Sequence, residues 1–423
     1  MQYLRMKKRN LNSPIIFERD QVKSIPLVLH NTGSFMLSAY RSAQDGKEPG
    51  GIPIGFDAKR AFFNSSGLGN YSRNLLNALV INHPQNSYYL FTPKTKDRFF
   101  LENEDSFSII GPQGMSRLFS SLWRTAFMTN NIKKLKLEIF HGLSQELPYG
   151  IGKSGARSVV TIHDLIFLRF PHFYKSVDTK IYYRKVVHAC RTADHIVAIS
   201  EQTRNDIIEF LDISPEKITV IYQGCSPDFR KSFSKEVFLE IKERYKLPDR
   251  YLLYTGTIEE RKNLLGIAKA IHVSGIDIPL VVIGRKTEPY YRKVLEYINS
   301  NNLKSIIFPG KVTNGDLPAL YQNAECFLYP SFFEGFGIPI VEALVSKTPV
   351  ITSNTGCFPE AGGPGSIYVD PYDPGMIGDA ILRVVKNKDV REKMVNIGSA
   401  HALKFRDEVI AEAYMKLYNS LLQ

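Results

Sequence analysis

Residues 326–346, CFLYPSFFEGFGIPIVEALVS, combine a strand pattern, a glycine-containing turn and a helix pattern. The run at 326–331 is apolar without alternation, which is typical of a parallel strand covered on both faces. Gly335 and Gly337 follow in the turn, and Pro339 stands near the first position of the predicted helix, where its missing N–H costs nothing. The stretch therefore predicts one strand–turn–helix unit of an α/β protein.

The same unit repeats along most of the chain. Short strand patterns alternate with helix-period segments, and most strand patterns are continuously apolar. The predicted strands are residues 52–57, 87–92, 138–142, 158–164, 195–200, 217–224, 251–257, 279–284, 305–310, 326–331, 349–354 and 366–370. We predict two Rossmann-like domains, each with a doubly wound parallel sheet, that face each other across a cleft.

Composition shifts divide the chain into segments. Residues 1–50 are basic at the start and Gly-rich at the end, which predicts a poorly ordered or loosely packed appendage. The polar stretch 225–238 separates two sets of strands, so we predict an N-terminal domain over 51–229 and a C-terminal domain over 230–406. The amphipathic pattern at 407–423 predicts a final helix that packs back on the first domain.

Charge and cysteine content restrict the class of protein. The net charge of +12 favours an anionic partner such as a nucleotide sugar, an acidic lipid surface or nucleic acid, although general solubility explains it equally well. The four cysteines are widely spaced, which indicates a reducing compartment and argues against zinc. No apolar run reaches the roughly 20 residues that span a bilayer. We expect a cytoplasmic protein that meets a membrane only from the side.

Two carboxylates, Glu334 and Glu342, flank the predicted anion-binding turn. Carboxylates accept hydrogen bonds from hydroxyl groups, and a nucleotide sugar has sugar hydroxyls on one side of its diphosphate and a ribose diol on the other. We expect Glu342 in the first turn of the helix. The alternative is an acidic residue favoured by the helix dipole, which explains Glu342 but not Glu334.

The motif Glu334-Gly335-Phe336-Gly337 with Glu342 resembles the E-x7-E signature of retaining glycosyltransferases of the GT-B fold, family 4 type. The resemblance covers about residues 52–423. It implies that Glu334 contacts the hydroxyls of the donor sugar and Glu342 the ribose. It also implies that Phe336, Gly337 and Ile338 contribute to the donor site.

A second segment, YLLYTGTIEERKNLLGIAKAI at 251–271, places Arg261 and Lys262 just before a predicted helix. Two cations at this point suit a diphosphate leaving group, although an isolated pair is more often a solvated basic turn. The segment resembles the family's first turn of the C-terminal domain, which implies donor contacts for Gly256, Thr257 and Lys262. Arg261 then substitutes for an arginine that many members carry in place of Thr257.

The first predicted strand is followed by a predicted loop with Gly67 and Gly69 and then a helix. The segment lacks the third glycine of a dinucleotide fingerprint. It is similar to the family's glycine loop, which lies over the donor phosphates.

Polar residues also follow two later strands of the first half. His163 and Asp164 end one strand, and the resemblance assigns to His163 an approach to the donor sugar, although a single histidine is more often structural. Ser200 and Arg204 follow the next strand and, together with Asp164, are candidates for an acceptor or phosphate contact.

The function expected from the resemblance is transfer of a hexose from a nucleotide diphosphate sugar to a glycan or lipid-linked acceptor, with retention. The stretches FDAKR at 56–60, GLGNYSRNLL at 67–76 and RKNL at 261–264 look most like those of mannosyltransferases that use GDP-mannose, which is therefore the expected donor. UDP-glucose, UDP-N-acetylglucosamine and deoxyhexose donors stay open. No Asp-x-Asp pair occurs, so we expect no metal and no cofactor. Segments 130–140 and 169–176 are candidates for a membrane-facing patch, or equally for a charged helix face and a core edge.

Two other classes of function stay open. A GT-B phosphorylase or nucleotide-sugar epimerase would show phosphate-dependent cleavage or isomerisation of the donor without an acceptor. A basic nucleic-acid-binding protein is the non-enzymatic alternative. The charged residues are dispersed, and no recognised nucleic-acid-binding motif appears, which argues against it.

Overall fold

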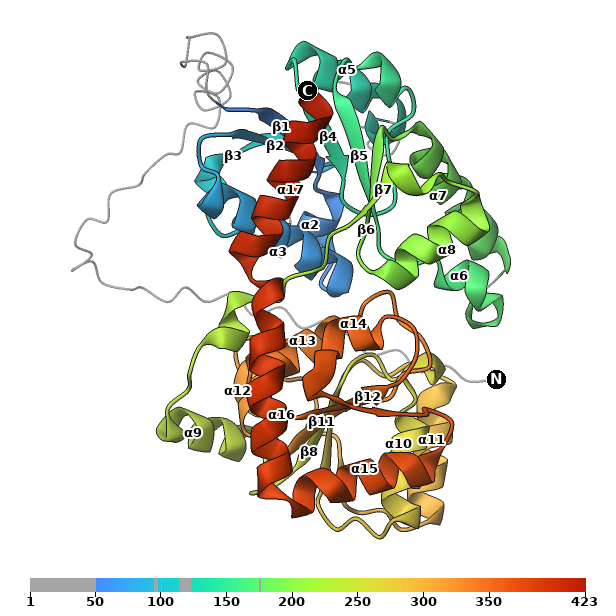
Figure 1. Ribbon diagram of the computed structural model, residues 1–423, viewed down its shortest axis with the longest axis vertical. Coiled ribbons are helices and arrows are strands. Elements are labelled where there is room, and N and C mark those ends of the chain that lie inside the picture. Colours follow the sequence, from blue (N-terminus) through green and yellow to red (C-terminus); the bar gives the residue numbers. More distant parts are fainter. Residues whose placement is uncertain (1–50, 95–97, 100, 114–122, 175) are drawn as a thin grey trace, which may run out of the picture. The chain divides into compact units, whose positions relative to one another are not determined.

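A computed structural model of the chain describes residues 51–94, 98–99, 101–113, 123–174 and 176–423 (Figure 1). The appendage expected at residues 1–50 lies outside the described residues. The fold below is that of the unit from Gly50 onward.

The described residues form two fully parallel sheets, one of seven strands and one of six. Their orders are β3-β2-β1-β4-β5-β6-β7 and β10-β9-β8-β11-β12-β13. The strands are β1 (Pro53–Asp57), β2 (Ser87–Phe91), β3 (Phe107–Ile110), β4 (Ile139–Gly142), β5 (Arg157–Ile162), β6 (His195–Ala198), β7 (Ile218–Val220), β8 (Leu252–Thr255), β9 (Leu280–Ile283), β10 (Ile306–Ile307), β11 (Cys326–Tyr329), β12 (Val350–Ser353) and β13 (Ile367–Val369).

Helices connect the strands, as parallel pairing requires, because a strand's end must return to the start of the next. The helices are α2 (Lys59–Phe63), α3 (Gly67–Asn82), α5 (Met128–Lys134), α6 (Ile166–Arg169), α7 (Ser176–Thr192), α8 (Glu201–Leu211), α9 (Lys235–Tyr245), α10 (Leu264–Val273), α11 (Tyr290–Ser300), α12 (Leu317–Gln322), α13 (Ile338–Val345), α14 (Phe358–Gly362), α15 (Pro374–Lys386), α16 (Lys388–His401) and α17 (Asp407–Leu422).

The predicted fold class is confirmed, and each predicted strand overlaps one of the observed strands. Strand β3 was not predicted. It lies at the edge of the first sheet, and three of its four residues are only partly buried. A short edge strand that is half exposed lacks the continuous apolar run by which the other strands are found.

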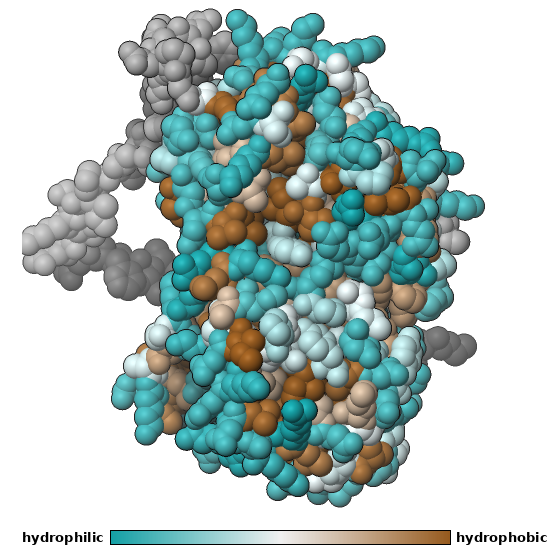
Figure 2. Space-filling view, viewed as in Figure 1, coloured by the Kyte–Doolittle hydropathy of each residue, from teal (hydrophilic) through white to brown (hydrophobic). Residues whose placement is uncertain are grey.

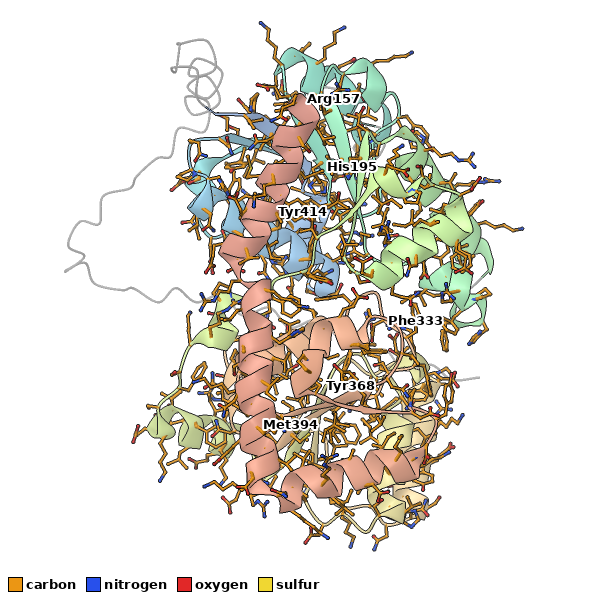
Figure 3. All side chains as sticks on the ribbon, viewed as in Figure 1. Arg157, His195, Phe333, Tyr368, Met394 and Tyr414 are labelled. Atoms are coloured by element: carbon orange, nitrogen blue, oxygen red, sulfur yellow. The ribbon has the colours of Figure 1, made fainter. Side chains whose placement is uncertain are left out.

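Apolar side chains cover both faces of each sheet and form four clusters. The last helix, α17, packs on α3 beside the first sheet, where Tyr414 lies over the strands (Figure 3). The boundary expected at residues 229 and 230 falls between the two sheets and stays a prediction. On the face in view, hydrophobic groups are scattered among hydrophilic ones (Figure 2), as on most proteins.

The strand order reverses beside the first strand of each sheet. Strand β1 pairs with β2 and β4, and β8 pairs with β9 and β11. In doubly wound sheets, ligands bind at the carboxyl ends of the strands where the order reverses. The segments after β8 and β11 therefore meet at the favoured ligand position of the second sheet.

Candidate functional site

The site is built on the turn between β11 and α13. Glu334 lies in this turn, and Gly337 caps α13 with φ 94°, a left-handed conformation that favours glycine. The helix begins at Ile338, so Glu342 lies in its second turn. The expectation of a first-turn position was wrong, because the helix starts at Ile338 as the sequence predicted and Glu342 follows it by four residues, which is more than one turn.

Glu334 is a buried carboxylate held by three donors. Its Oε1 accepts hydrogen bonds from Lys262 Nζ at 2.6 Å and from the Tyr329 hydroxyl at 2.9 Å. Its Oε2 lies 2.6 Å from Arg261 Nη1. Burial opposes ionisation, but the two cations prevail and lower the pKa of Glu334 to about 2. The side chain is therefore ionised at neutral pH.

The two cations come from the turn after β8, as the sequence predicted. Arg261 also bonds Glu259 Oε1 at 2.6 Å and the carbonyl of Phe333 at 2.7 Å. Asn263 follows in the left-handed conformation, and its side chain caps α10 by accepting from the Gly266 amide. Two cations and two carboxylates thus occupy the switch point, and both cations are already paired with Glu334.

The glycine of this turn, Gly256, lies beside Lys262. A Cβ atom on Gly256 would be 3.1 Å from Lys262 Cδ, so Gly256 leaves room for the lysine stem. Thr257 is half-buried and its carbonyl accepts a hydrogen bond from Tyr254 at 3.4 Å.

Glu342 faces a cavity of about 320 Å³ that Ile338 and Gly67 also line. Its Oε2 accepts a hydrogen bond from the Tyr321 hydroxyl at 3.1 Å. Burial outweighs this hydrogen bond and the nearby charge of Lys262, and it raises the pKa of Glu342 to about 7. The two carboxylates of the motif therefore have opposite electrostatic environments.

The side chain of Phe336, expected to bind the donor, is buried in the structure and has little access to a ligand. Its side chain is 2% exposed and packs between Tyr222 and Phe405, with ring centroids 5.5 Å away in both cases. Only the backbone of Phe336 is therefore available to contact a ligand.

The two glycines of the first domain lie in the first turn of α3, so the prediction of a loop was wrong at these residues. Gly67 is exposed and a Cβ atom there would meet nothing within 4 Å. Gly69 packs so closely on the Asn64 carbonyl that a Cβ atom would lie 1.8 Å from its oxygen. Gly67 is thus open to a ligand, whereas Gly69 is required for packing between α2 and α3.

His163 is 4% exposed and both of its ring nitrogens have protein partners. Nε2 donates to the Leu143 carbonyl at 2.8 Å, which leaves Nδ1 to accept from the Gln223 amide at 3.2 Å. The edge of the ring faces Tyr71, with centroids 4.7 Å apart. Burial lowers the pKa of His163 to about 4, so the ring is neutral at pH 7 and its proton is fixed on Nε2.

The candidates for acceptor contacts have different surroundings. Asp164 accepts from the Ile166 amide, and burial raises the pKa of its carboxyl. Arg204 is partly exposed and lies 3.7 Å from Glu201. Ser200 is fully buried, caps α8, and donates its hydroxyl proton to the carbonyl of Gly335 at 2.6 Å. The serine hydroxyl is thus already engaged by the second domain.

Sequence reasoning missed three residues of the site. Tyr329 and Tyr321 donate to the two motif carboxylates, and Glu360 binds the N-terminus of α8. Tyr329 could have been inferred from the sequence, because it ends the strand that leads to Glu334. Tyr321 and Glu360 belong to other connections, and nothing in their local sequence marks them.

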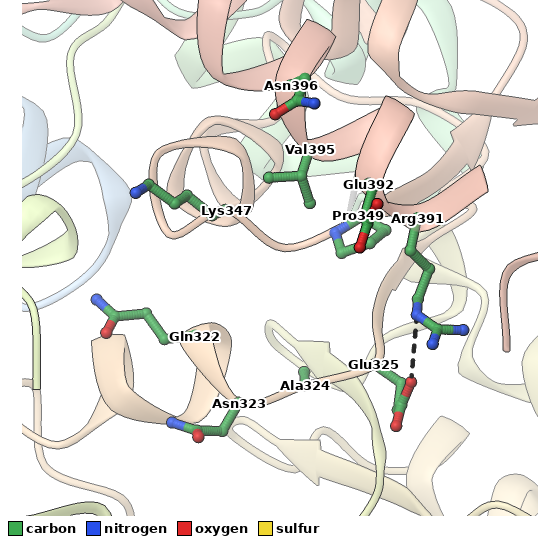
Figure 4. A pocket seen from close by; sticks show the side chains of 10 residues that line it. All are labelled: Gln322, Asn323, Ala324, Glu325, Lys347, Pro349, Arg391, Glu392, Val395 and Asn396. Atoms are coloured by element: carbon green, nitrogen blue, oxygen red, sulfur yellow. Dashed lines mark ion pairs between the residues drawn. The ribbon is translucent and has the colours of Figure 1, made fainter. Parts of the chain in front are cut away.

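Two further cavities lie in the second domain. One of about 460 Å³ lies at the carboxyl ends of β9 and β10 and is lined in part by Gly284, Lys286, Phe308 and Val312. The other, of about 470 Å³, lies by Glu325 at the opposite end of β11 from Glu334, and Arg391 pairs with Glu325 across its wall (Figure 4).

The described residues contain neither a metal-binding cluster nor a membrane-spanning helix. Within them, no cluster of three or more His, Cys, Asp or Glu side chains is arranged to hold a metal ion. No described helix combines the length and apolar character that crossing a membrane requires. The membrane contact expected for residues 130–140 and 169–176 stays a prediction.

Solved structures show the same fold, with two Rossmann-like domains arranged as in GT-B glycosyltransferases. A glycosyltransferase from Rickettsia africae matches with a TM-score of 0.69 at 17% identity, over 88% of this chain and 99% of its own. Anabaena HepE, solved with UDP and glucose, matches with a TM-score of 0.66 at 16% identity, over 87% and 100%.

Family comparisons identify the chain more closely. Residues 65–229 match Glycosyltransferase Family 4 and residues 238–401 match Glycosyl transferases group 1. The O-antigen chain mannosyltransferase B of Escherichia coli is 30% identical over 298 residues, 69% of this chain and 76% of its own. The chain belongs to the group 1, family 4 glycosyltransferases. The serotype-specific mannosyltransferase WbdA of Escherichia coli is 29% identical over 58% of this chain, but only 31% of its own length is matched.

Proposed function

We propose that this glycosyltransferase transfers mannose from GDP-mannose, with retention, to a sugar hydroxyl of a lipid-linked or surface polysaccharide. The main support for this proposal is that the ionised Glu334 is held between Arg261 and Lys262 at the switch point of the second sheet. The relatives named as O-antigen mannosyltransferases support mannose and a polysaccharide acceptor.

The charges of the site fit a nucleotide diphosphate. In the structure, Glu334 and Glu259 balance Arg261 and Lys262. A diphosphate brings negative charge that the same two cations can share, and Glu334 then has lone pairs available for the sugar hydroxyls. Glu342 supplies acceptor oxygens for the ribose diol in the adjoining cavity.

We place the nucleobase of the donor in the cavity at the carboxyl ends of β9 and β10. The cavity beyond β9 and β10 includes the ring of Phe308 and the stem of Lys286, an apolar and cationic lining that suits a flat aromatic base. With the ribose at Glu342 and the base there, the nucleotide extends along the carboxyl edge of the second sheet, where ligands of this fold class bind.

The proposed reaction breaks the bond between C1 of the sugar and the diphosphate oxygen, and the acceptor hydroxyl oxygen forms the new bond on the same face. The departing phosphate oxygen takes the acceptor proton, so no enzyme nucleophile is required. Arg261 and Lys262 stabilise the charge that develops on the leaving group, and no metal or cofactor is needed. His163 is neutral with its proton engaged, so its contribution is to position the reacting groups.

Thermal stabilisation by nucleotides tests the proposal. GDP, UDP and their mannose and glucose esters are added to the wild type, to Lys262→Ala and to the exposed control Lys293→Ala. A ligand at 100 times its Kd adds about 2.7 kcal/mol to folding stability. We expect GDP and GDP-mannose to stabilise the wild type and the control but not Lys262→Ala.

Product analysis then tests the reaction. GDP-mannose and an α-mannoside acceptor are incubated with the enzyme, and the configuration of the new linkage is read by NMR. Stabilisation by UDP alone would contradict the donor, an inverted linkage would contradict retention, and no stabilisation by any nucleotide would contradict the assignment of the site.

A further inference from the structure

The N-terminus of α8, in the first domain, is docked on the Glu334 turn of the second domain. Ser200 Oγ donates to the Gly335 carbonyl at 2.6 Å. Thr203 Oγ1 lies 3.3 Å from the same carbonyl and 3.2 Å from the carbonyl of His163. Both hydroxyl-bearing residues are almost fully buried, at 0% and 1% exposure. Two buried hydroxyls thus converge on the peptide that follows Gly335.

The first amides of α8 bind a second group across the same interface. The carboxylate of Glu360 accepts from the Glu201 amide at 2.7 Å and from the Gln202 amide at 3.2 Å. Glu360 lies on α14, and its own carbonyl is held by His401 and Lys404 at 3.0 and 3.1 Å. A carboxylate is the group that a helix N-terminus favours most, so this contact joins the domains firmly.

The backbone of the turn is also in close contact with the first domain. A Cβ atom on Gly335 would lie 2.1 Å from the His163 carbonyl oxygen and 3.1 Å from Asp164 Cβ. On the other side, the Cys357 thiol donates to the Glu334 carbonyl at 3.2 Å. The peptides on both sides of Gly335 are therefore fixed, one from each domain.

We infer that Ser200, Thr203 and Glu360 are positioning residues for the transfer reaction. They dock α8 on the Glu334 turn, so that closing the domains and placing Glu334 next to the His163 segment are a single event. The inference rests on the proposed function in one respect, namely that Glu334 binds the donor sugar. It gives Ser200 a task other than the acceptor or phosphate contact expected from the sequence.

An ordinary helix cap is the competing explanation, and the chain contains a matched control. Ser234 caps α9 by accepting from the Val237 amide, as Ser200 does from the Thr203 amide. Ser234 is exposed, however, and among the described residues its hydroxyl bonds none of the other domain. Ser234→Ala thus removes a cap alone. Ser200→Ala removes a cap together with the link to Gly335.

Hydrogen exchange measured by mass spectrometry separates the two explanations without any substrate. In Ser200→Ala and in Thr203→Val, we expect peptides of the second domain that cover residues 332–346 and 357–362 to exchange about tenfold faster than in the wild type. In Glu360→Ala, the amides of Glu201 and Gln202 lose protection, and Glu360→Gln restores most of it. Faster exchange confined to residues 201–206 in the serine and threonine variants would overturn the inference.

Steady-state kinetics test the positioning role. Thr203→Val removes one hydroxyl with little change of volume, so we expect a folded enzyme whose kcat falls about tenfold while its KM for GDP-mannose changes less than about twofold. An unchanged kcat, or a rise in KM alone, would overturn the inference. A wild type that binds no nucleotide would overturn the proposed function instead, and the exchange result would still decide the docking.

Discussion

Replacing Glu334 by glutamine keeps the shape of the side chain and removes its charge. Arg261 and Lys262 are 15% and 12% exposed, and their shared partner is 11% exposed, so the variant leaves two largely buried cations with one remaining carboxylate, Glu259. Loss of one member of a buried charge cluster is strongly destabilising, because the remaining charges stay desolvated. We therefore expect Glu334→Gln to fold less stably as well as to lose activity.

The size of the loss follows from the pKa. A pKa that falls from 4.5 to about 2 corresponds, at about 1.4 kcal/mol per pKa unit, to about 3 kcal/mol of folding stability for Glu334. Because the folded-state pKa is depressed, this stability is present above pH 4.5 and is lost as the pH falls through 2. The difference between wild type and variant should therefore be largest at neutral pH and shrink in acid.

Calorimetric or circular-dichroism melting at pH 7 and pH 3 measures this difference. For a domain of this size, about 3 kcal/mol corresponds to a melting temperature lower by roughly 6 to 12 °C. Glu325→Gln is the matched control, because Glu325 also contacts two arginines, at 2.7 and 3.6 Å, but at a more exposed position. We expect the control to lose no more than about 1 kcal/mol. Equal losses in the two variants, or a loss that grows in acid, would refute the reasoning.

Three other outcomes are expected. Gly335→Ala places a Cβ atom 2.1 Å from the His163 carbonyl, so transfer should fall about 100-fold with nucleotide binding retained, and wild-type turnover would show that the contact is dispensable. Burial raises the pKa of Glu342 to about 7, so nucleotide affinity measured by calorimetry should rise from pH 6 to 8. Folding stability falls between pH 4.5 and about 7, because in that range the buried carboxyl keeps a proton that the unfolded chain releases. Tyr321→Phe should move that midpoint upward, and a flat profile would argue against ribose binding at Glu342. Asn263→Ala removes the cap of α10 and buried bonds to two carbonyls, so urea unfolding should show a loss of about 2 to 4 kcal/mol, and a loss under 1 kcal/mol would contradict this account.

Part of the site follows from local sequence and general topology. Arg261 and Lys262 follow β8, Glu334 follows β11, and these strands are neighbours in the sheet. The carboxyl ends of neighbouring parallel strands lie at one edge, so the convergence of these three residues was predictable. The helical position of Gly67 was not predictable, because the cap of a helix depends on backbone conformation rather than on pattern alone.

The amino-acid sequence by itself determined the two parallel sheets, because continuous apolar runs between helical segments can be buried only with helices on both faces. It also determined which turns carry the charged residues. Only the tertiary structure decided how those residues are engaged: Ser200 reaches a carbonyl 135 residues away, and Glu360 binds amides 158 and 159 residues away. The opposite pKa directions of Glu334 and Glu342 likewise depend on burial and on neighbours brought in by other segments. These properties arise from contacts between distant parts of the chain, and no local pattern encodes them.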